Sequence, residues 1–308
     1  MGQASAGGSG RFRVMINHVV IIGASVSGHN IALGIKRKCK DCSITLVSEE
    51  GYPAYDHLRI ADFISGTIAE KDIFLCDEGF YQKEGIDFIK NKKVGSINTQ
   101  KSAIYFKDKG SINYNMLVIA SGRSPAIPDI SGARKEGAYR MYTLDDAREF
   151  LKRYIAHPVC IVGSDSLAIK VAEAISERYG VEIKVLSRAA FDPSGIPAKT
   201  EIIHDSLAEV IGEGEVQAVK LKSGKVFGVC SVLFMDDYRS SIDFLKNTDI
   251  RVKDDFIVVD GWMSTNYDNI FACGSVVRKD SIVISMMLVD NIIGRLEKKD
   301  ARSAGAIL

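Results

Sequence analysis

The sequence predicts an α/β fold of two parallel-sheet units, the second inserted in the first, each with a small antiparallel meander. Three observations support this prediction. Residues 18–38 change from an apolar run to a helical pattern across a glycine turn, as a buried parallel strand followed by a helix does. A second strand–turn–helix pattern opens at Pro158, roughly 140 residues after the first. Alternating apolar and polar residues follow each pattern, which is typical of antiparallel strands.

The first turn has the residues that a nucleotide-binding turn needs. The apolar run Val19–Ile22 breaks at Gly23, and Ile31, Ala32 and Ile35 recur on one face of the following helix. Because a pyrophosphate must approach unpaired backbone amides at a helix N-terminus, small residues are required there. The turn is a G-x-S-x-x-G form of the dinucleotide fingerprint, made of Gly23, Ala24, Ser25, Val26, Ser27 and Gly28. A tight turn without a ligand is the alternative interpretation.

An acidic pair follows the next expected strand, Ser43–Val47. In dinucleotide-binding units a carboxylate about 20 residues after the glycine turn holds a ribose hydroxyl. We therefore expect Glu49, with Glu50 beside it, to contact a ribose. A solvated acidic loop is the alternative.

The rest of the first unit is predicted from shorter patterns. Gly51–Gly66 reads as a loop passing into a short helix, and Asp72–Gly85 as another helix. An antiparallel meander is expected from Ile86 to Gly110. The buried strand Met116–Ala120 follows and ends in Ser121-Gly122.

The second unit begins with a strand that ends at Gly163. The patterns then predict a helix over Ser164–Tyr179, a strand over Val181–Leu186, a meander over Val216–Phe234, a strand over Phe256–Val259 and a helix over Ser285–Glu297. We expect residues 15–123 and 237–308 to form one domain and residues 124–236 the inserted one. Residues 1–14 are expected to be a tag or disordered.

Composition excludes several classes of protein. The 308 residues are 46% hydrophobic and carry a formal net charge of +1. That length supports two hydrophobic cores, and the chain lacks the basic surface of a nucleic-acid-binding protein. No apolar run is long enough to span a membrane, and no secretory signal is visible. We expect a cytoplasmic protein that binds no nucleic acid and has no membrane span.

Six cysteines occur at positions 39, 42, 76, 160, 230 and 273. In a chain of this size without a secretion signal, free thiols are expected rather than a disulfide framework. Cys39 and Cys42 form the one C-x-x-C pair, at the end of the first helix and away from the glycine turn. A zinc site would need two more ligands, and none has the required spacing. We expect a structural or incidental pair and no metal site.

Together these segments resemble the pyridine nucleotide–disulfide oxidoreductase-like flavoproteins. The resemblance is strongest to the flavin parts of nitrite reductase large subunits, rubredoxin reductases and ferredoxin reductases, and it covers Val14 to Gly294. It implies two Rossmann-like dinucleotide-binding domains. Residues 15–123 and 237–308 would bind FAD, and residues 124–236 would form an NAD(P)-binding-like domain with a degenerate motif.

The resemblance also assigns residues to FAD, which is the cofactor that it implies. Gly23–Gly28 matches the pyrophosphate turn and Glu49 the adenosine-ribose carboxylate. The other matching positions are His57 and Arg59 in a helix beside the flavin, Ala120, Ser121 and Gly122 in a crossing segment, and Gly274, Ser275 and Val276 in the second FAD motif. His57 stands where the family usually has Arg, and Ser275 where it has Asp. No side chain is expected to act as a catalytic acid, base or nucleophile.

The second unit departs from the family's nicotinamide motif. Gly163 is retained, but Asp165 replaces the middle glycine, and its charge would repel a phosphate. Lys170 replaces a Glu that commonly contacts the nicotinamide end. Ser187 and Arg188 stand where an NAD enzyme has an acidic residue, and Arg188 fits either an NADP 2′-phosphate or an ordinary surface position. Whether NAD(P)H binds here is left open.

Two functions follow from this resemblance. The first is a FAD-containing oxidoreductase that passes electrons between NAD(P)H and a redox partner with an iron–sulfur or metal centre. In that case Arg59 and His57 would line the flavin, where a positive charge stabilises the reduced form. The alternative is a flavoprotein subunit of a larger redox complex that no longer uses NAD(P)H, which Asp165, Lys170 and Ser275 favour.

The end of the sequence bears on partners. The family continues beyond Asn291–Gly294 into a C-terminal interface domain, and the stretch Ile282–Leu288 is strongly apolar. We therefore expect an interface at this stretch. Both a homo-oligomer and a hetero-oligomer are left open.

Overall fold

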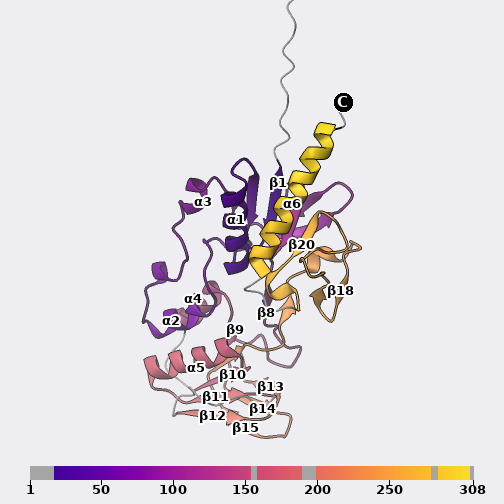
Figure 1. The fold of residues 1–308 in the computed structure, drawn as a ribbon. Helices are drawn as coiled ribbons and strands as arrows, with labels where there is room; N and C mark the ends of the chain where they lie inside the picture. The colour runs from indigo at the N-terminus through magenta and orange to yellow at the C-terminus, as the bar shows by residue number, and fades with distance from the viewer. Residues whose placement is uncertain (1–16, 154–157, 189–198, 279–283, 306–308) are drawn as a thin grey trace, which may run out of the picture.

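Two parallel sheets with helices packed on them organise the chain (Figure 1), which confirms the predicted α/β class. The structure is a computed structural model, and it describes residues 17–153, 158–188, 199–278 and 284–305. The first sheet has the strand order β20-β7-β1-β2-β3 and contains only parallel pairs. Its strands are β1 (His18–Ile22), β2 (Ser43–Val47), β3 (Asp87–Ile89), β7 (Met116–Ile119) and β20 (Ile270–Ala272).

Helices α1 (Val26–Lys38) and α6 (Ile284–Gly305) lie side by side against this first sheet (Figure 1). The strands bury both faces, as β1 does with Val19, Val20 and Ile21 fully buried. This explains why β1 reads as a continuous apolar run and not as an alternating one.

The second sheet has the order β12-β11-β10-β16-β9 and is also parallel. Its strands are β9 (Ala138–Arg140), β10 (Val159–Val162), β11 (Ile183–Leu186), β12 (Thr200–Ile203) and β16 (Ser231–Phe234). Helix α5 (Ser166–Tyr179) connects β10 to β11, and α4 (Leu144–Arg153) follows β9. All five strands lie in the sequence between β7 and β20 of the first sheet, which is the order of an inserted unit.

Each unit has a three-stranded antiparallel meander, as expected. The first contains β4 (Val94–Asn98), β5 (Ala103–Phe106) and β6 (Ser111–Asn113), and the second contains β13 (Leu207–Ile211), β14 (Ala218–Leu221) and β15 (Val226–Gly228). The predicted meander ranges, Ile86–Gly110 and Val216–Phe234, are too long, because they include β3 and β16, which belong to the parallel sheets. The remaining short elements are the strand pairs β8 (Arg123–Ser124) with β17 (Arg239–Ser240) and β18 (Val252–Lys253) with β19 (Phe256–Ile257), and the 3-10 turns η1 (Glu70–Asp72), η2 (Asp243–Leu245) and η3 (Gly274–Val276).

The predicted helix over Asp72–Gly85 is wrong. Only η1 and the single turn α3 (Phe80–Lys83) are helical there. Phe74 instead forms an antiparallel bridge with Tyr55, and the Leu75 amide donates to the Ala54 carbonyl at 2.8 Å. This pairing with a distant segment holds the chain extended and overrides the local apolar pattern.

Helix α2 (Arg59–Ser65) precedes the inserted unit in sequence but packs on its helix α5. Ile60 and Ile64 are fully buried in the same hydrophobic cluster as Val171 and Ile175 of α5. Figure 1 shows α2 and α4 next to α5 and away from α1. Helix α2 thus belongs to the hydrophobic cluster of the second unit, which is separate from the core of the first sheet. The domain boundaries stay a prediction.

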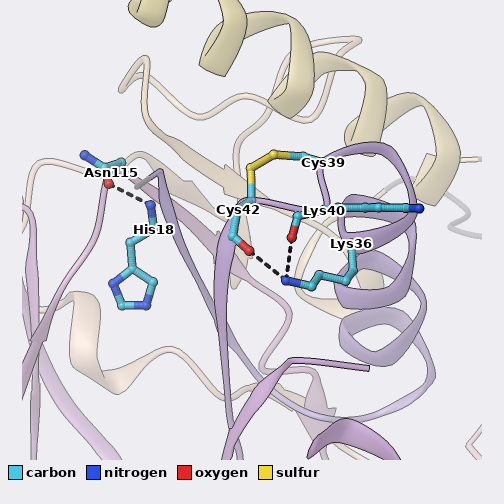
Figure 2. Close-up of a disulfide and its surroundings, with 6 residues drawn as sticks. All are labelled: His18, Lys36, Cys39, Lys40, Cys42 and Asn115. Atoms are coloured by element: carbon cyan, nitrogen blue, oxygen red, sulfur yellow. Dashed lines mark hydrogen bonds between the residues drawn. A yellow bond between two sulfur atoms is a disulfide. The ribbon is translucent and has the colours of Figure 1, made fainter. Parts of the chain in front are cut away.

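The expectation of free thiols is wrong for Cys39 and Cys42, which form a disulfide (Figure 2). Cys39 ends α1, and a hydrogen bond from the Cys42 amide to the Cys39 carbonyl at 3.3 Å closes a turn. The turn brings the two Cα atoms to 5.4 Å, a usual spacing for a disulfide. Cys76, Cys160, Cys230 and Cys273 are free.

Two terminal segments of interest fall largely outside the described residues. They are residues 1–14 and the first part of the apolar stretch Ile282–Leu288. At the end of that stretch Met286 is 76% exposed and Met287 40% exposed.

Candidate functional site: a nucleotide cavity at the edge of the first sheet

A cavity of about 630 Å³ lies beyond the carboxyl ends of β1, β2, β7 and β20. Open parallel sheets bind ligands at this edge, in the crevice where the strand order reverses. Four segments line most of it: the glycine turn at Gly23–Ser27, residues 48–53 after β2, Ala120–Ser124 after β7, and Gly274-Ser275 after β20.

The glycine turn requires both of its glycines. Gly23 has φ +105°, and its amide donates to the Val47 carbonyl at 2.8 Å. A Cβ on Gly23 would lie 2.2 Å from the Ala120 carbonyl oxygen, and one on Gly28 would lie 1.9 Å from the Gly23 carbonyl oxygen. Gly28 does not line the cavity but lets the helix approach the turn.

The N-terminus of α1 is arranged to receive an anion. Ser25 is its N-cap, and the Ser25 side chain makes no capping hydrogen bond. The amides of the first helical turn therefore remain available to a ligand, and the helix dipole favours negative charge there.

The motif at Gly274–Val276 lies next to this same glycine turn. Gly274 has φ +74°, and a Cβ there would lie 3.0 Å from Ser27 Oγ. A Cβ on Gly122 would lie 3.7 Å from Ser275 Oγ. The structure thus brings together three segments that the sequence analysis assigned to one ligand. Val276 is instead fully buried in the core.

Ser121 provides an independent test of whether this cavity suits a polar ligand. Among the residues that the structure describes, its Oγ is one of the few buried side-chain oxygens without a hydrogen-bond partner. Buried hydroxyls are normally satisfied, because an unmade hydrogen bond costs about 1–3 kcal/mol. A ligand group in the cavity would satisfy this hydroxyl.

Two carboxylates lie at the β2 end of the cavity. Glu50 accepts a hydrogen bond from the Tyr55 hydroxyl at 2.6 Å, and burial raises the pKa of Glu50. Burial and the neighbouring Glu50 raise the pKa of Tyr55, which therefore stays a donor. Glu49 forms an ion pair with Lys93, and its carboxylate is exposed. Both carboxylates are placed where a ribose would be held.

His57 lines the cavity as a neutral ring. It stacks on Tyr142 with ring centroids 4.4 Å apart, and burial lowers the pKa of His57 to about 4. The positive charge that the sequence analysis assigned to His57 is therefore absent at neutral pH. Arg59 begins α2 outside the cavity, with its Nε 4.0 Å from Asp62.

The cations that do line the cavity were not singled out from the sequence. They are Lys93, Arg123 and Arg140. Arg123 directly follows Ser121-Gly122, so its position in the motif was a usable signal. It donates to the Tyr238 carbonyl at 2.5 Å and to Asp255 at 3.0 Å. Arg140 and Tyr142 come from the other unit, and no local pattern indicates them.

The turn at Gly163 has the same backbone design as the first turn. Gly163 has φ +137°, and its amide donates to the Leu186 carbonyl at 3.0 Å. Its helix N-terminus differs, because Asp165 is the N-cap and its Oδ1 accepts the Ala168 amide at 2.8 Å. A carboxylate of the chain itself thus caps one of the amides at the helix N-terminus where a pyrophosphate would be held.

Further charges surround this second turn. Arg188 donates to Asp236 and to Asp237, each at 2.7 Å, and these hydrogen bonds raise the pKa of Arg188. Ser187 is buried, and its hydroxyl lies 2.8 Å from that of Ser164. The Arg188 guanidinium is therefore already paired with two carboxylates.

The residues of the first cavity fit the pyrophosphate and ribose of FAD. The sequence profile of the pyridine nucleotide-disulphide oxidoreductase family matches residues 17–294, and the chain belongs to this family. Members of the family depend on FAD and NAD(P)H, which confirms FAD as the implied cofactor, with NAD(P)H as a possible second one.

Two curated relatives cover most of the chain. An NADH oxidase from Methanocaldococcus jannaschii is 26% identical over 283 residues, which are 84% of this chain and 62% of the relative. An NADH-rubredoxin oxidoreductase from Clostridium acetobutylicum is 25% identical over 265 residues, 84% of this chain and 67% of the relative. The chain thus spans about two thirds of the length of these relatives.

The fold is also that of a solved ferredoxin reductase from Rhodopseudomonas palustris. The two structures superpose with a TM-score of 0.81 at 18% identity, over 91% of this chain and 76% of the other. In the ranges that the structure describes, no helix is long and apolar enough to cross a membrane. Within those same ranges, no group of three or more His, Cys, Asp or Glu residues is placed to hold a metal ion.

Proposed function

We propose that this chain is a FAD-dependent oxidoreductase that passes electrons between NAD(P)H and a redox partner protein. The observation that supports it most is the meeting of Gly23–Ser27, Ser121-Gly122 and Gly274-Ser275 around one cavity. When bound, FAD supplies the hydride and electron transfer, and the protein supplies binding, orientation and electrostatics.

Each lining residue then has a binding role. The first-turn amides of α1 hold the pyrophosphate, and Glu49 and Glu50 hold ribose hydroxyls. The Ser121 hydroxyl gains its missing partner. Neutral His57, stacked on Tyr142, lines the cavity without a charge. Arg123, which is paired with Asp255, lies in the same lining.

Anaerobic reduction of the reconstituted protein tests the proposal. We expect a yellow protein with a flavin spectrum that bleaches when NADH or NADPH is added. A colourless protein that takes up no FAD would contradict every flavin function of the chain.

The Ser121→Ala variant tests the cavity itself. We expect its FAD dissociation constant to rise about 5- to 10-fold, because one hydrogen bond is worth about 1 kcal/mol. Ser111→Ala, at an exposed position in β6, is the matched control and should bind FAD as the parent does. Equal FAD affinity in all three proteins would remove Ser121 from the site.

A second candidate function is favoured by the second turn. Asp165 caps the α5 amides, and Arg188 is paired with Asp236 and Asp237. In this reading the chain is a flavoprotein subunit that receives electrons from a partner subunit. Flavin that is reduced by dithionite but by neither nicotinamide nucleotide would favour this second function over the first.

The proposed function also includes a redox partner, an oligomeric state and a cellular location. We propose a partner with an iron–sulfur or metal centre, supported by the rubredoxin and ferredoxin reductases among the similar proteins. A homo- or hetero-oligomer and a cytoplasmic location are proposed from the sequence alone. Size-exclusion chromatography with light scattering measures the oligomeric state directly.

A further inference from the structure

The disulfide between Cys39 and Cys42 lies at the end of α1 that is opposite to the nucleotide cavity. The glycine turn precedes α1 and the disulfide follows it. Since α1 has 13 residues, its length separates the two features by about 20 Å. The disulfide therefore belongs to a different place from the proposed flavin site.

The two sulfurs differ in accessibility. Cys39 is partly exposed, and Cys42 is 2% exposed. Thiol–disulfide exchange begins with attack of a thiolate on one sulfur of the disulfide, and access helps to decide which one. An external thiolate therefore reaches Cys39 first, and Cys42 is the leaving group.

A cation, Lys36, binds the turn that carries the leaving group. Lys36 Nζ donates to the Cys42 carbonyl at 3.1 Å and to the Lys40 carbonyl at 2.9 Å (Figure 2). Figure 2 also shows that the Lys40 side chain points away from the disulfide. Nearby ammonium groups favour the thiolate form of cysteine, so we expect Lys36, which binds the Cys42 carbonyl, to favour release of Cys42.

The short loop between the two cysteines limits how much this disulfide stabilises the fold. A cross-link stabilises mainly by restricting the unfolded chain, and this effect grows with the length of the closed loop. Cys39 and Cys42 are only three positions apart, so the loop is very short. This pair therefore stabilises the fold less than a cross-link between distant residues would.

We propose that Cys39 and Cys42 are a redox-active pair that exchanges with an external dithiol. A thiolate of the dithiol attacks Cys39 Sγ, the Cys39–Cys42 bond breaks, and Cys42 leaves as a thiolate that takes up a proton. The second thiol of the dithiol then attacks the first sulfur of the dithiol, which is bonded to Cys39 in the mixed disulfide. Cys39 leaves as a thiolate and is protonated. Two electrons and two protons pass to the pair, and the dithiol becomes a disulfide. This proposal does not rest on the proposed flavin function.

The first experiment uses the folded full chain without any nicotinamide nucleotide. The protein is incubated with dithiothreitol as the dithiol probe, alkylated, and mapped by mass spectrometry. We expect the accessible Cys39 to be alkylated once the disulfide has opened, while the buried Cys160 and Cys273 stay unmodified. Adding glutathione disulfide should close the pair again. Reduction that occurs only in denaturant, or a reduced pair that does not close, would overturn the proposal.

Single variants test the order of attack. Cys42→Ser leaves Cys39, which should form a mixed disulfide with glutathione disulfide at least about tenfold faster than Cys42 does in Cys39→Ser. Equal rates would contradict the assigned roles. Circular dichroism checks that both variants are folded, and the experiment on the parent protein decides the proposal if either is not.

Lys36→Met tests the cation, with Lys40→Met as the matched control. We expect reduction of the parent disulfide to slow several-fold in Lys36→Met and to stay unchanged in Lys40→Met. Equal effects in the two variants would show that Lys36 has no particular role. The flavin spectrum should be the same in all of these proteins, so this test fails or succeeds separately from the proposed function.

Discussion

Asp165 is the residue that most separates the two glycine turns of this chain. Gly23 and Gly163 make equivalent backbone hydrogen bonds to the neighbouring strands. The N-cap of α1 is Ser25, which makes no capping bond, whereas Asp165 caps α5 with its own carboxylate. The N-terminus of α1 is therefore open to an anion, whereas the Asp165 carboxylate occupies the N-terminus of α5.

We expect Asp165→Gly to strengthen binding of NADH or NADPH by about tenfold. Removing a charge next to a phosphate is worth about 1 kcal/mol or more near the surface. Replacing the Asp N-cap by Gly costs only a few tenths of a kcal/mol, so the gain exceeds the loss. Isothermal titration calorimetry measures the affinity. Asp165→Asn keeps a capping side chain and removes the charge, and unchanged affinity in both variants would show that the charge is not the obstacle.

His57 is expected to make the folded protein sensitive to acid. Its pKa is about 4 in the folded state, below the ordinary value of 6.5. Between these two values the unfolded chain takes up a proton and the folded chain does not. Stability that is present above pH 6.5 is therefore lost as the pH falls towards 4, by at most about 3 kcal/mol.

His57→Phe keeps the stacking on Tyr142 and removes the titration. We expect the free energy of unfolding of this variant, measured with urea from pH 7 to pH 4, to fall less than that of the parent. Other titrating groups are common to both proteins and cancel in the difference. Two parallel curves would show that the ring is protonated as easily in the folded chain as in the unfolded one.

Helix α1 depends on Gly28 for its close position against the end of β1. A Cβ on Gly28 would lie 1.9 Å from the Gly23 carbonyl oxygen, which is backbone and cannot rotate away. We expect Gly28→Ala to lower the free energy of unfolding by about 1–3 kcal/mol, as overpacking does, and to weaken FAD binding as well.

Gly294 in α6 is the matched control, since a Cβ there meets nothing within 4 Å. Gly294→Ala is expected to stabilise the protein by up to about 1 kcal/mol, because alanine is the better helix former. Urea unfolding of both variants measures the contrast. A loss of stability in Gly294→Ala as large as that in Gly28→Ala would show that the close approach at Gly28 does not explain the effect.

Local sequence patterns account for some elements of the fold and miss others. β1, α1 and β2 were predictable because an apolar run, a glycine turn and a helical face are properties of neighbouring residues. The segment Asp72–Gly85 was not, because its extended form depends on pairing with Ala54 and Tyr55.

The same distinction holds for the site. Gly23, Ser121 and Gly274 belong to motifs, and the fold brings them together as expected. Arg140 and Tyr142 enter the cavity from the inserted unit, so only the three-dimensional arrangement shows them. The neutral state of His57 likewise depends on burial, which residue identity does not determine.

The two sheets are joined through α2, which suggests how the protein as a whole unfolds. Ile64 of α2 is fully buried in the cluster around α5, whereas Ile104 of β5 is fully buried in the core of the first unit. Because α2 follows the cavity residues Tyr55 and His57 directly, loss of either core disturbs the other unit. We expect one cooperative transition in differential scanning calorimetry.

Ile64→Ala and Ile104→Ala should each shift this common transition, since removing a buried isoleucine side chain costs about 2–5 kcal/mol. FAD should raise the melting temperature of both variants. A ligand that binds only the folded state stabilises every part of the protein that unfolds in the same transition as the binding site. Two separate transitions, with Ile64→Ala moving one and Ile104→Ala the other, would show that the units unfold independently. In that case FAD should raise only the transition that Ile104→Ala moves, because the glycine turn and the second FAD motif both belong to the first sheet.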